Sequence, residues 1–188
     1  QTAGRALRNN DIHEMRALVR EDDKIDYLET SCIEYLSKIR QKPLSSEESL
    51  THQQLMVSAV ALEHLADIIE TDLVELGITA IQINHRRSEE TKRLTTALFL
   101  CVEDCIQLLG NVLSEKDRGA AEKILHYEGK IESLQQELMT RKSSRLGSAE
   151  EAALRTARIE VAMSDKLVWM YSLIKRITEE NVETAAAP

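Results

Sequence analysis

Residues 44–76 read LSSEESLTHQQLMVSAVALEHLADIIETDLVEL, and this stretch decides the fold. Ser45 is followed three residues later by Glu48, which is the spacing of a capping box at the start of a helix. Apolar residues then recur every seven positions, at Leu55, Leu62, Ile69 and Leu76. Because seven residues return to nearly the same helical face, the stretch predicts a long amphipathic helix that packs on other helices.

The rest of the chain has the same helical character. Aromatic residues make up 3% of the chain, and only two of its 188 residues are proline, a composition that favours helices over strands. Two further serine–acid pairs, Ser114 with Asp117 and Ser148 with Glu151, indicate helix starts. We predict an all-α antiparallel bundle with helices near residues 3–41, 46–76, 87–113, 115–145 and 148–182. Residues 78–87 either extend the second helix or form a loop.

Charge and cysteine content exclude several classes of protein. The net charge of −8 opposes binding to a phosphate backbone, so we expect no nucleic-acid partner. No stretch reaches about 18 uninterrupted apolar residues, and no signal peptide opens the chain, so we expect no membrane span within it. Cys32, Cys101 and Cys105 fit neither a disulfide framework nor a zinc-finger spacing, and we expect them to be reduced core residues of a cytoplasmic protein.

Carboxylates interrupt three apolar rows of seven-residue period. Asp26 interrupts the row of Ile12, Val19 and Ile33, Asp67 lies between Val60 and Val74, and Glu132 lies between Leu125 and Met139. Each has an acid four residues earlier, at Asp22, Glu63 and Glu128 respectively, and such pairs repel when nothing bridges them. Moving a carboxylate out of water is costly unless a cation compensates. Either a bound metal ion or a basic side chain can be that cation, and the spacing leaves both open.

An internal repeat relates the two halves of the chain. Residues 22–29 resemble residues 128–135 at a shift of 106, and residues 62–67 fall over residues 164–169. We predict two units, 1–80 and 81–183, followed by a disordered tail at 184–188. The second unit has three predicted helices and the first has two. The first helix of the first unit is therefore missing or lies outside the chain, unless a partner chain covers the gap.

These residues resemble the PhoU family, most closely the PhoU-like C-terminal domain of bacterial sodium/phosphate cotransporters. The matching stretches are Asp22 to Leu36, Leu44 to Leu76 and, more weakly, Glu128 to Leu146. The family pattern Leu-Glu-x-Ile-Gly-Asp-x-Ile is matched by LEHLADII at Leu62 to Ile69, where Ala66 takes the place of the glycine. The resemblance implies two three-helix bundles side by side.

The resemblance also implies metal ligands. Some family members hold iron or zinc clusters on Glu/Asp-x-x-x-Asp motifs, and the matching positions are Asp22, Asp26, Glu63 and Asp67 in the first unit and Glu128, Glu132 and Asp165 in the second. Trp169 departs from the motif, because it stands where the fourth acid of the second unit would be. The all-oxygen ligands also suit magnesium or manganese. The alternative that the chain binds no metal is also left open.

The resemblance implies a noncatalytic regulatory domain of a sodium-dependent phosphate cotransporter. Such a domain would lie in the cytoplasm, attached to the inner membrane through an upstream transmembrane domain. Its expected partner is the membrane domain of the transporter, either in the same chain or as a separate chain. The alternatives are a freestanding PhoU-type regulator of phosphate uptake and signalling, and a ligand-free dimerisation scaffold. A homodimer is the natural state of such a scaffold. None of the five histidines follows a glutamate by three residues, so the Glu-x-x-His signature of a di-iron enzyme is absent.

Overall fold

The computed structural model describes residues 5–6, 9, 11–83, 88–145 and 151–182, except for the side chains of residues 18–22, 142–145 and 152–153. Within these residues the chain is helical and contains no strand, so the all-α prediction is confirmed. The helices are α2 (Ile12–Arg40), α3 (Ser46–Asp67), the π-helix η1 (Ile68–Leu73), α4 (Val74–Gln82), α5 (Glu89–Glu115), α6 (Arg118–Arg145) and α7 (Glu151–Val182).

Local capping explains where the first helices begin. The predicted box is present at α3, since the Ser45 hydroxyl accepts from the Glu48 amide at 3.2 Å and the Glu48 carboxylate accepts from the Ser45 amide at 2.8 Å. The prediction that the first helix runs unbroken from residue 3 is wrong. Asp11 has an extended backbone and its side chain caps the Glu14 amide, so α2 begins at Ile12.

The predicted cap at Ser114 is also wrong. Ser114 lies in the last turn of α5, where its hydroxyl donates to the Gly110 carbonyl at 2.8 Å. Lys116 then takes a left-handed conformation, with φ of 51°, and ends α5. The cap of α6 is Asp117, whose carboxylate accepts from the Ala120 amide at 3.1 Å. The predicted cap at Ser148 lies outside the described residues.

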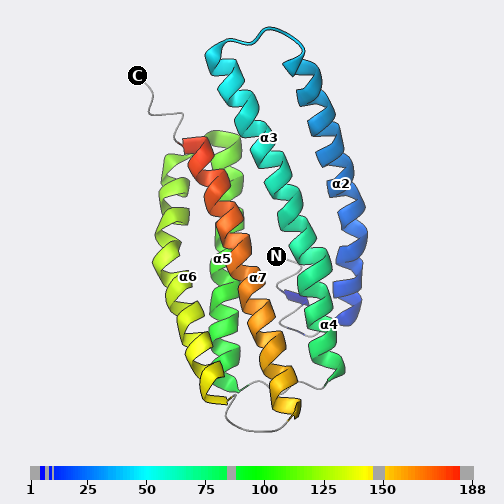
Figure 1. The fold of residues 1–188 in the computed structure, drawn as a ribbon, viewed down its shortest axis with the longest axis vertical. Helices are drawn as coiled ribbons and strands as arrows, with labels where there is room; N and C mark the ends of the chain where they lie inside the picture. The colour runs from blue at the N-terminus through cyan, green and yellow to red at the C-terminus, as the bar shows by residue number, and fades with distance from the viewer. Residues whose placement is uncertain (1–4, 7–8, 10, 84–87, 146–150, 183–188) are drawn as a thin grey trace.

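The helices form an antiparallel bundle in which α7 lies between the two halves of the chain (Figure 1). On one side α7 contacts α3, η1 and α4, and on the other side it contacts α5 and α6. The α2 helix lies at the edge, where α3, η1 and α4 are its main neighbours. The core therefore follows α7, and α2 is the peripheral helix of the first unit.

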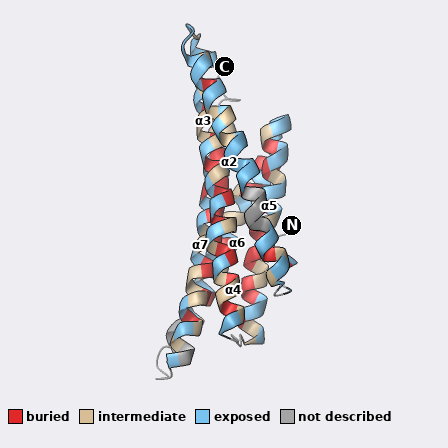
Figure 2. Cartoon of the chain, turned by 90° about the vertical axis from the view of Figure 1, so that its right-hand side faces the viewer, coloured by how far each residue is buried: buried red, intermediate tan, exposed pale blue. Residues whose placement is uncertain are grey.

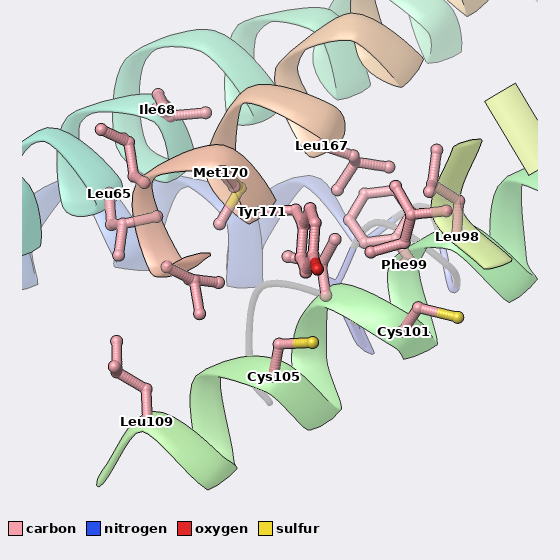
Figure 3. Close-up of a cluster of buried hydrophobic side chains, with 14 of the residues drawn as sticks. Leu65, Ile68, Leu98, Phe99, Cys101, Cys105, Leu109, Leu167, Met170 and Tyr171 are labelled. Atoms are coloured by element: carbon pink, nitrogen blue, oxygen red, sulfur yellow. The ribbon is translucent and has the colours of Figure 1, made fainter. Parts of the chain in front are cut away.

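The α5 helix supplies one wall of the core. Leu98, Cys105 and Leu109 are fully or almost fully buried, and they meet Leu167 and Met170 of α7 in a shared apolar cluster (Figure 3). By length and composition α5 could cross a membrane, which the search for uninterrupted apolar runs did not indicate. Its packing against α6 and α7 is that of a core helix in a bundle.

A π-helix interrupts the second helix immediately after Asp67. Buried positions on α3 recur every three or four residues as far as Leu65 and Ile68, but the next one in this series is Leu73, five residues later. The wider turn of η1 accommodates the extra residue, so that the apolar face of α4 still points to the core. The helix then continues to Gln82, so the question left open at residues 78–87 is answered as far as residue 83, and residues 84–87 lie outside the described part.

One apolar face of α2 and α3 is uncovered in the first unit, as the pale outer side of α2 in Figure 2 indicates. Ile25 is 37% exposed, whereas Ile131, its counterpart in the repeat, is 1% exposed because α5 and α7 pack around α6. Leu55 on α3 is 50% exposed, and its counterpart Ala157 on α7 is 5% exposed. The same comparison holds for Cys32 against Leu138 and for Leu62 against Ser164. The described residues of the first unit thus provide no equivalent of α5.

The two isoleucines give a matched test of this difference. We expect Ile131→Ala to lower the free energy of unfolding by about 2–4 kcal/mol, because it leaves a cavity in the core. Ile25→Ala should cost less than about 1 kcal/mol. Urea denaturation of both variants measures the difference, and equal losses would mean that the Ile25 face is covered in solution.

The caps give a second test. We expect Ser45→Ala and Asp117→Ala each to cost about 1 kcal/mol of unfolding free energy, since each leaves a helix amide without its acceptor. Ser114→Ala is the matched control and should cost less than about 0.5 kcal/mol, because its hydroxyl bonds to a carbonyl inside α5. Thermal denaturation followed by circular dichroism measures all three, and a Ser114 loss as large as that of Asp117 would contradict the assignment.

Candidate functional site

Two acids of the first unit meet on α3. Glu63 and Asp67 are one helical turn apart, close enough for Asp67 to raise the pKa of Glu63. The Glu63 side chain is 24% exposed, while Asp67 is exposed at the rim. The structure therefore brings together the two acids of the LEHLADII motif, directly before the π-helix η1.

The register of α2 against α3 places the other two predicted ligands. The His52 ring lies 2.9 Å from the Leu36 carbonyl, and Arg40 donates to the Ser49 hydroxyl at 3.0 Å. Continued along the antiparallel pair, this register puts Asp26 level with Glu63 and Asp22 level with Asp67. The Asp26 side chain is exposed, and the Asp22 side chain lies outside the described residues.

Among the described side chains of α2, the carboxylate that acts on Glu63 is that of Glu29, which the sequence analysis missed. Its charge raises the Glu63 pKa, and its side chain is partly buried. A signal for it was available, because Glu29 follows Asp22 by seven residues and so returns to the same helical face.

The electrostatics of this group are those of crowded carboxylates. Burial is the largest cause of a raised pKa at Glu63, followed by the charge and hydrogen bond of Asp67. The His64 ring lies 3.6 Å from the Glu63 carboxylate and opposes the shift, although 53% of its side chain is exposed. Charge on this group is costly, and a cation would relieve the cost.

The carboxylates fit a metal ion by chemistry and only in part by geometry. Among the described side chains, no three His, Cys, Asp or Glu residues form a group ready to hold a metal. Glu63 and Asp67 nonetheless offer adjacent oxygen donors, which hard cations prefer. The exposed side chain of Asp26 on α2 would have to turn toward the pair to add a third donor.

The acids of the second unit are arranged differently. Glu128 on α6 forms an ion pair with Lys175 on α7, and the Lys175 ammonium lies 3.8 Å from the carboxylate of Glu179. The hydrogen bond that Lys175 donates to the Glu128 carboxylate raises the Lys175 pKa, and the charges of Glu128, Glu179 and Glu132 add to that shift. Glu132 itself is exposed. A basic side chain, one of the two cations that the sequence left open, compensates Glu128.

The third predicted ligand of this unit lies elsewhere. Asp165 is exposed and precedes Lys175 by ten residues, which is about 15 Å along α7. Next to it, Lys166 pairs with Asp72 of η1 at 2.7 Å and lies 4.9 Å from the centre of the Trp169 ring. By helical periodicity Asp165 is on the same face of α7 as the cavity-lining Val168 and Ser172, but it lies closer to the N-terminal end of the helix than the group around Glu128.

A cavity of about 390 Å³ lies between α6 and α7 beside the second group. Its lining residues are Glu128, Ile131, Glu132, Gln135, Val168, Tyr171, Ser172, Lys175, Arg176 and Glu179. The Tyr171 hydroxyl donates its proton in a hydrogen bond to the Ile124 carbonyl, at 3.1 Å. The cavity carries acids and bases together, unlike the purely acidic pair on α3.

The cysteines differ in burial, and so do neighbouring residues of the last helix. Cys101 and Cys105 are buried thiols as predicted, and burial raises the pKa of Cys105 to about 12, which keeps it protonated. The prediction that Cys32 is a core residue is wrong, because it is exposed on α2. Met170 and Tyr171 are buried, whereas Trp169 is 50% exposed.

Comparison with known proteins agrees with this architecture. No protein-family model matches the chain, and no curated protein matches it. Among solved structures, the crystal structure of PhoU from Pseudomonas aeruginosa superposes with a TM-score of 0.82 at 15% sequence identity, covering 98% of this chain and 87% of that one. This chain has the PhoU fold. The expected PhoU-like helical bundle is thereby confirmed, and the match does not extend to the link with a cotransporter.

The raised pKa of Glu63 gives a pH-dependent prediction for this PhoU-fold chain. The folded state holds the Glu63 proton more tightly than the unfolded chain, so ionisation costs stability. The cost is absent below the usual pKa of 4.5 and is complete above the raised folded pKa. We expect Glu63→Gln to raise the unfolding free energy at pH 7 by a few tenths of a kcal/mol, with no gain at pH 4.

Urea denaturation in metal-free buffer at both pH values measures this effect. Glu34→Gln, an exposed acid on α2, is the control and should behave alike at both pH values. A loss of stability at pH 7 in Glu63→Gln would show that the carboxylate is well solvated or paired.

Proposed function

We propose that this chain is a noncatalytic regulator of phosphate uptake and phosphate signalling in the cytoplasm, acting by binding a partner of the uptake system. The observation that carries the proposal is the superposition of 98% of the chain on PhoU, together with the LEHLADII motif at Leu62–Ile69. Because the match spans nearly the whole of this chain and most of PhoU, a freestanding PhoU-type regulator is the reading that it supports best.

The acidic pair on α3 is the proposed sensing element. A cation at Glu63 and Asp67, with Asp22 and Asp26 from α2, would supply the positive charge that holds the two helices together. Iron, zinc, magnesium and manganese are the metals to test. The acidic pair is connected to the core through the helix that follows it, since η1 begins directly after Asp67 and leads to α4, which packs on α7.

A second reading, the regulatory domain of a sodium/phosphate cotransporter, is favoured by the uncovered face of α2 and α3. Ile25, Leu28 and Leu55 are exposed where the second unit has α5 across the matching surface. A helix of the transporter's membrane part, joined to this chain or separate from it, would cover that face as α5 covers its own unit. A homodimer and a plain dimerisation scaffold are the alternatives for the same surface.

Phosphate uptake tests the regulatory proposal. We expect removal of the gene to change the initial rate of radioactive phosphate uptake by intact cells, and the wild-type gene to restore it. A Glu63→Gln/Asp67→Asn variant should restore less than wild type, whereas Glu34→Gln should restore fully. Uptake that is the same with and without the gene, at low and high external phosphate, would contradict the proposal.

Sedimentation with membrane vesicles separates the two readings. Vesicles that contain a sodium/phosphate cotransporter or a phosphate-transport ATPase are mixed with the purified chain. Binding to the former that Leu28→Glu abolishes and Leu100→Glu on α5 leaves intact supports the cotransporter domain, because Leu100 is an exposed leucine outside the α2–α3 face. Binding only to the latter supports the freestanding regulator, and a dimer with no binding supports the scaffold.

Elemental analysis tests the metal. After equilibration with each of the four metals and removal of excess, we expect wild-type protein to retain metal and Glu63→Gln/Asp67→Asn to lose it. Equal background content in both proteins would remove the metal from the proposal while leaving the regulatory role to the uptake assay.

A further inference from the structure

The second unit contains a cation of its own where the repeat predicts a metal. Lys175 extends from α7 to Glu128 on α6 and lies between that acid and Glu179, with 28% of its side chain exposed. Glu128 and Glu132 are the two acids of this unit that share a helical face, and both line the cavity that also contains Lys175. The ammonium group therefore lies at the oxygens that a metal would need.

The first unit lacks this lysine. At the shift that pairs residues 62–67 with 164–169, Leu73 corresponds to Lys175, and Val74 does so once the extra residue of η1 is counted. Both residues are apolar and buried. The position that matches Lys175 thus offers the acids on α3 no ammonium, whereas Glu128 is neutralised from across the helix pair.

Two further features oppose a metal in the second unit. The third expected donor, Asp165, lies about 15 Å along α7 from the level of Lys175 and is not among the residues that line the cavity with Glu128 and Glu132. Arg176 adds another positive side chain to the cavity lining. A divalent ion bound to Glu128 would lie within a few ångströms of the ammonium, where like charges repel strongly.

We propose that Lys175 replaces a metal ion in the second unit, so that Glu128 holds α6 to α7 through an internal ammonium and this unit binds no metal. The proposal depends on the α6–α7 contacts and not on the regulatory function. It makes the chain asymmetric, since only the first unit keeps acids that a metal can bridge.

Removal of the lysine should expose the latent donor set. In a Glu63→Gln/Asp67→Asn background, which silences the first unit, we expect no Mn²⁺ or Zn²⁺ binding by titration calorimetry. Adding Lys175→Met, which keeps the length of the side chain without its charge, should produce measurable Mn²⁺ binding where the background shows none. Adding Glu128→Gln to that variant should abolish the gain.

Lys166→Met is the matched control, because Lys166 is on the same helix and pairs with Asp72 away from Glu128. It should leave metal binding unchanged. Lys175→Gln provides a second neutral variant should Lys175→Met fail to fold, and circular dichroism checks both. A gain with Lys166→Met equal to that with Lys175→Met would overturn the proposal.

The wild-type chain gives a direct test that needs no lysine variant. Glu128→Gln alone should leave the metal content unchanged by elemental analysis and should lower the midpoint of thermal unfolding, because Lys175 loses its partner. Loss of bound Zn²⁺ or Mn²⁺ on Glu128→Gln would show that the second unit holds a metal, and the proposal would then be wrong.

Discussion

The position of α7, which packs on helices from both halves of the chain, is the constraint on which the rest of the structure depends. Leu167, Met170 and Ile174 are almost completely removed from water, and the helix contacts α3, η1 and α4 as well as α5 and α6. Burying each such side chain contributes about 1.5–3 kcal/mol relative to leaving it exposed. Since both units use this one helix as a wall, neither has a separate core. The acids of the two units are therefore held on a common frame.

On that frame the two units compensate their carboxylates in different ways. Glu128 has an ammonium from α7 within its reach, and the ion pair ties α6 to α7 at the edge of the cavity. Glu63 has Asp67 and Glu29 nearby, and the raised pKa expresses the cost of that crowding. Both copies of the repeated motif thus keep their acids, but only the copy with Glu63 still needs a cation from outside the chain.

The sequence predicted the features that depend on periodicity and adjacent residues, and it failed where the contact comes from another helix. The box at Ser45 and the pair of Glu63 with Asp67 are local, so spacing was sufficient. Asp117 and not Ser114 caps α6, because the left-handed turn at Lys116 ends α5 after Ser114. The spacing of residues along the sequence is compatible with a cap at either position. Lys175 could not be assigned to Glu128, because residues 47 positions apart meet only through the register of α6 and α7. The exposure of Cys32 likewise depends on a covering helix that the described residues do not include.

The π-helix at residues 68–73 identifies a difference in length between the two copies of the repeat. Upstream of it, Leu65 and Ile68 match Leu167 and Met170 at one shift, whereas downstream Leu73 and Gly77 match Ile174 and Thr178 only when the shift is one smaller. The first copy has therefore accepted a single-residue insertion that α7 lacks, and it absorbed the insertion by widening one turn. Any alignment of the two copies, or of this chain with its relatives, needs a gap at that turn for the buried positions downstream to correspond.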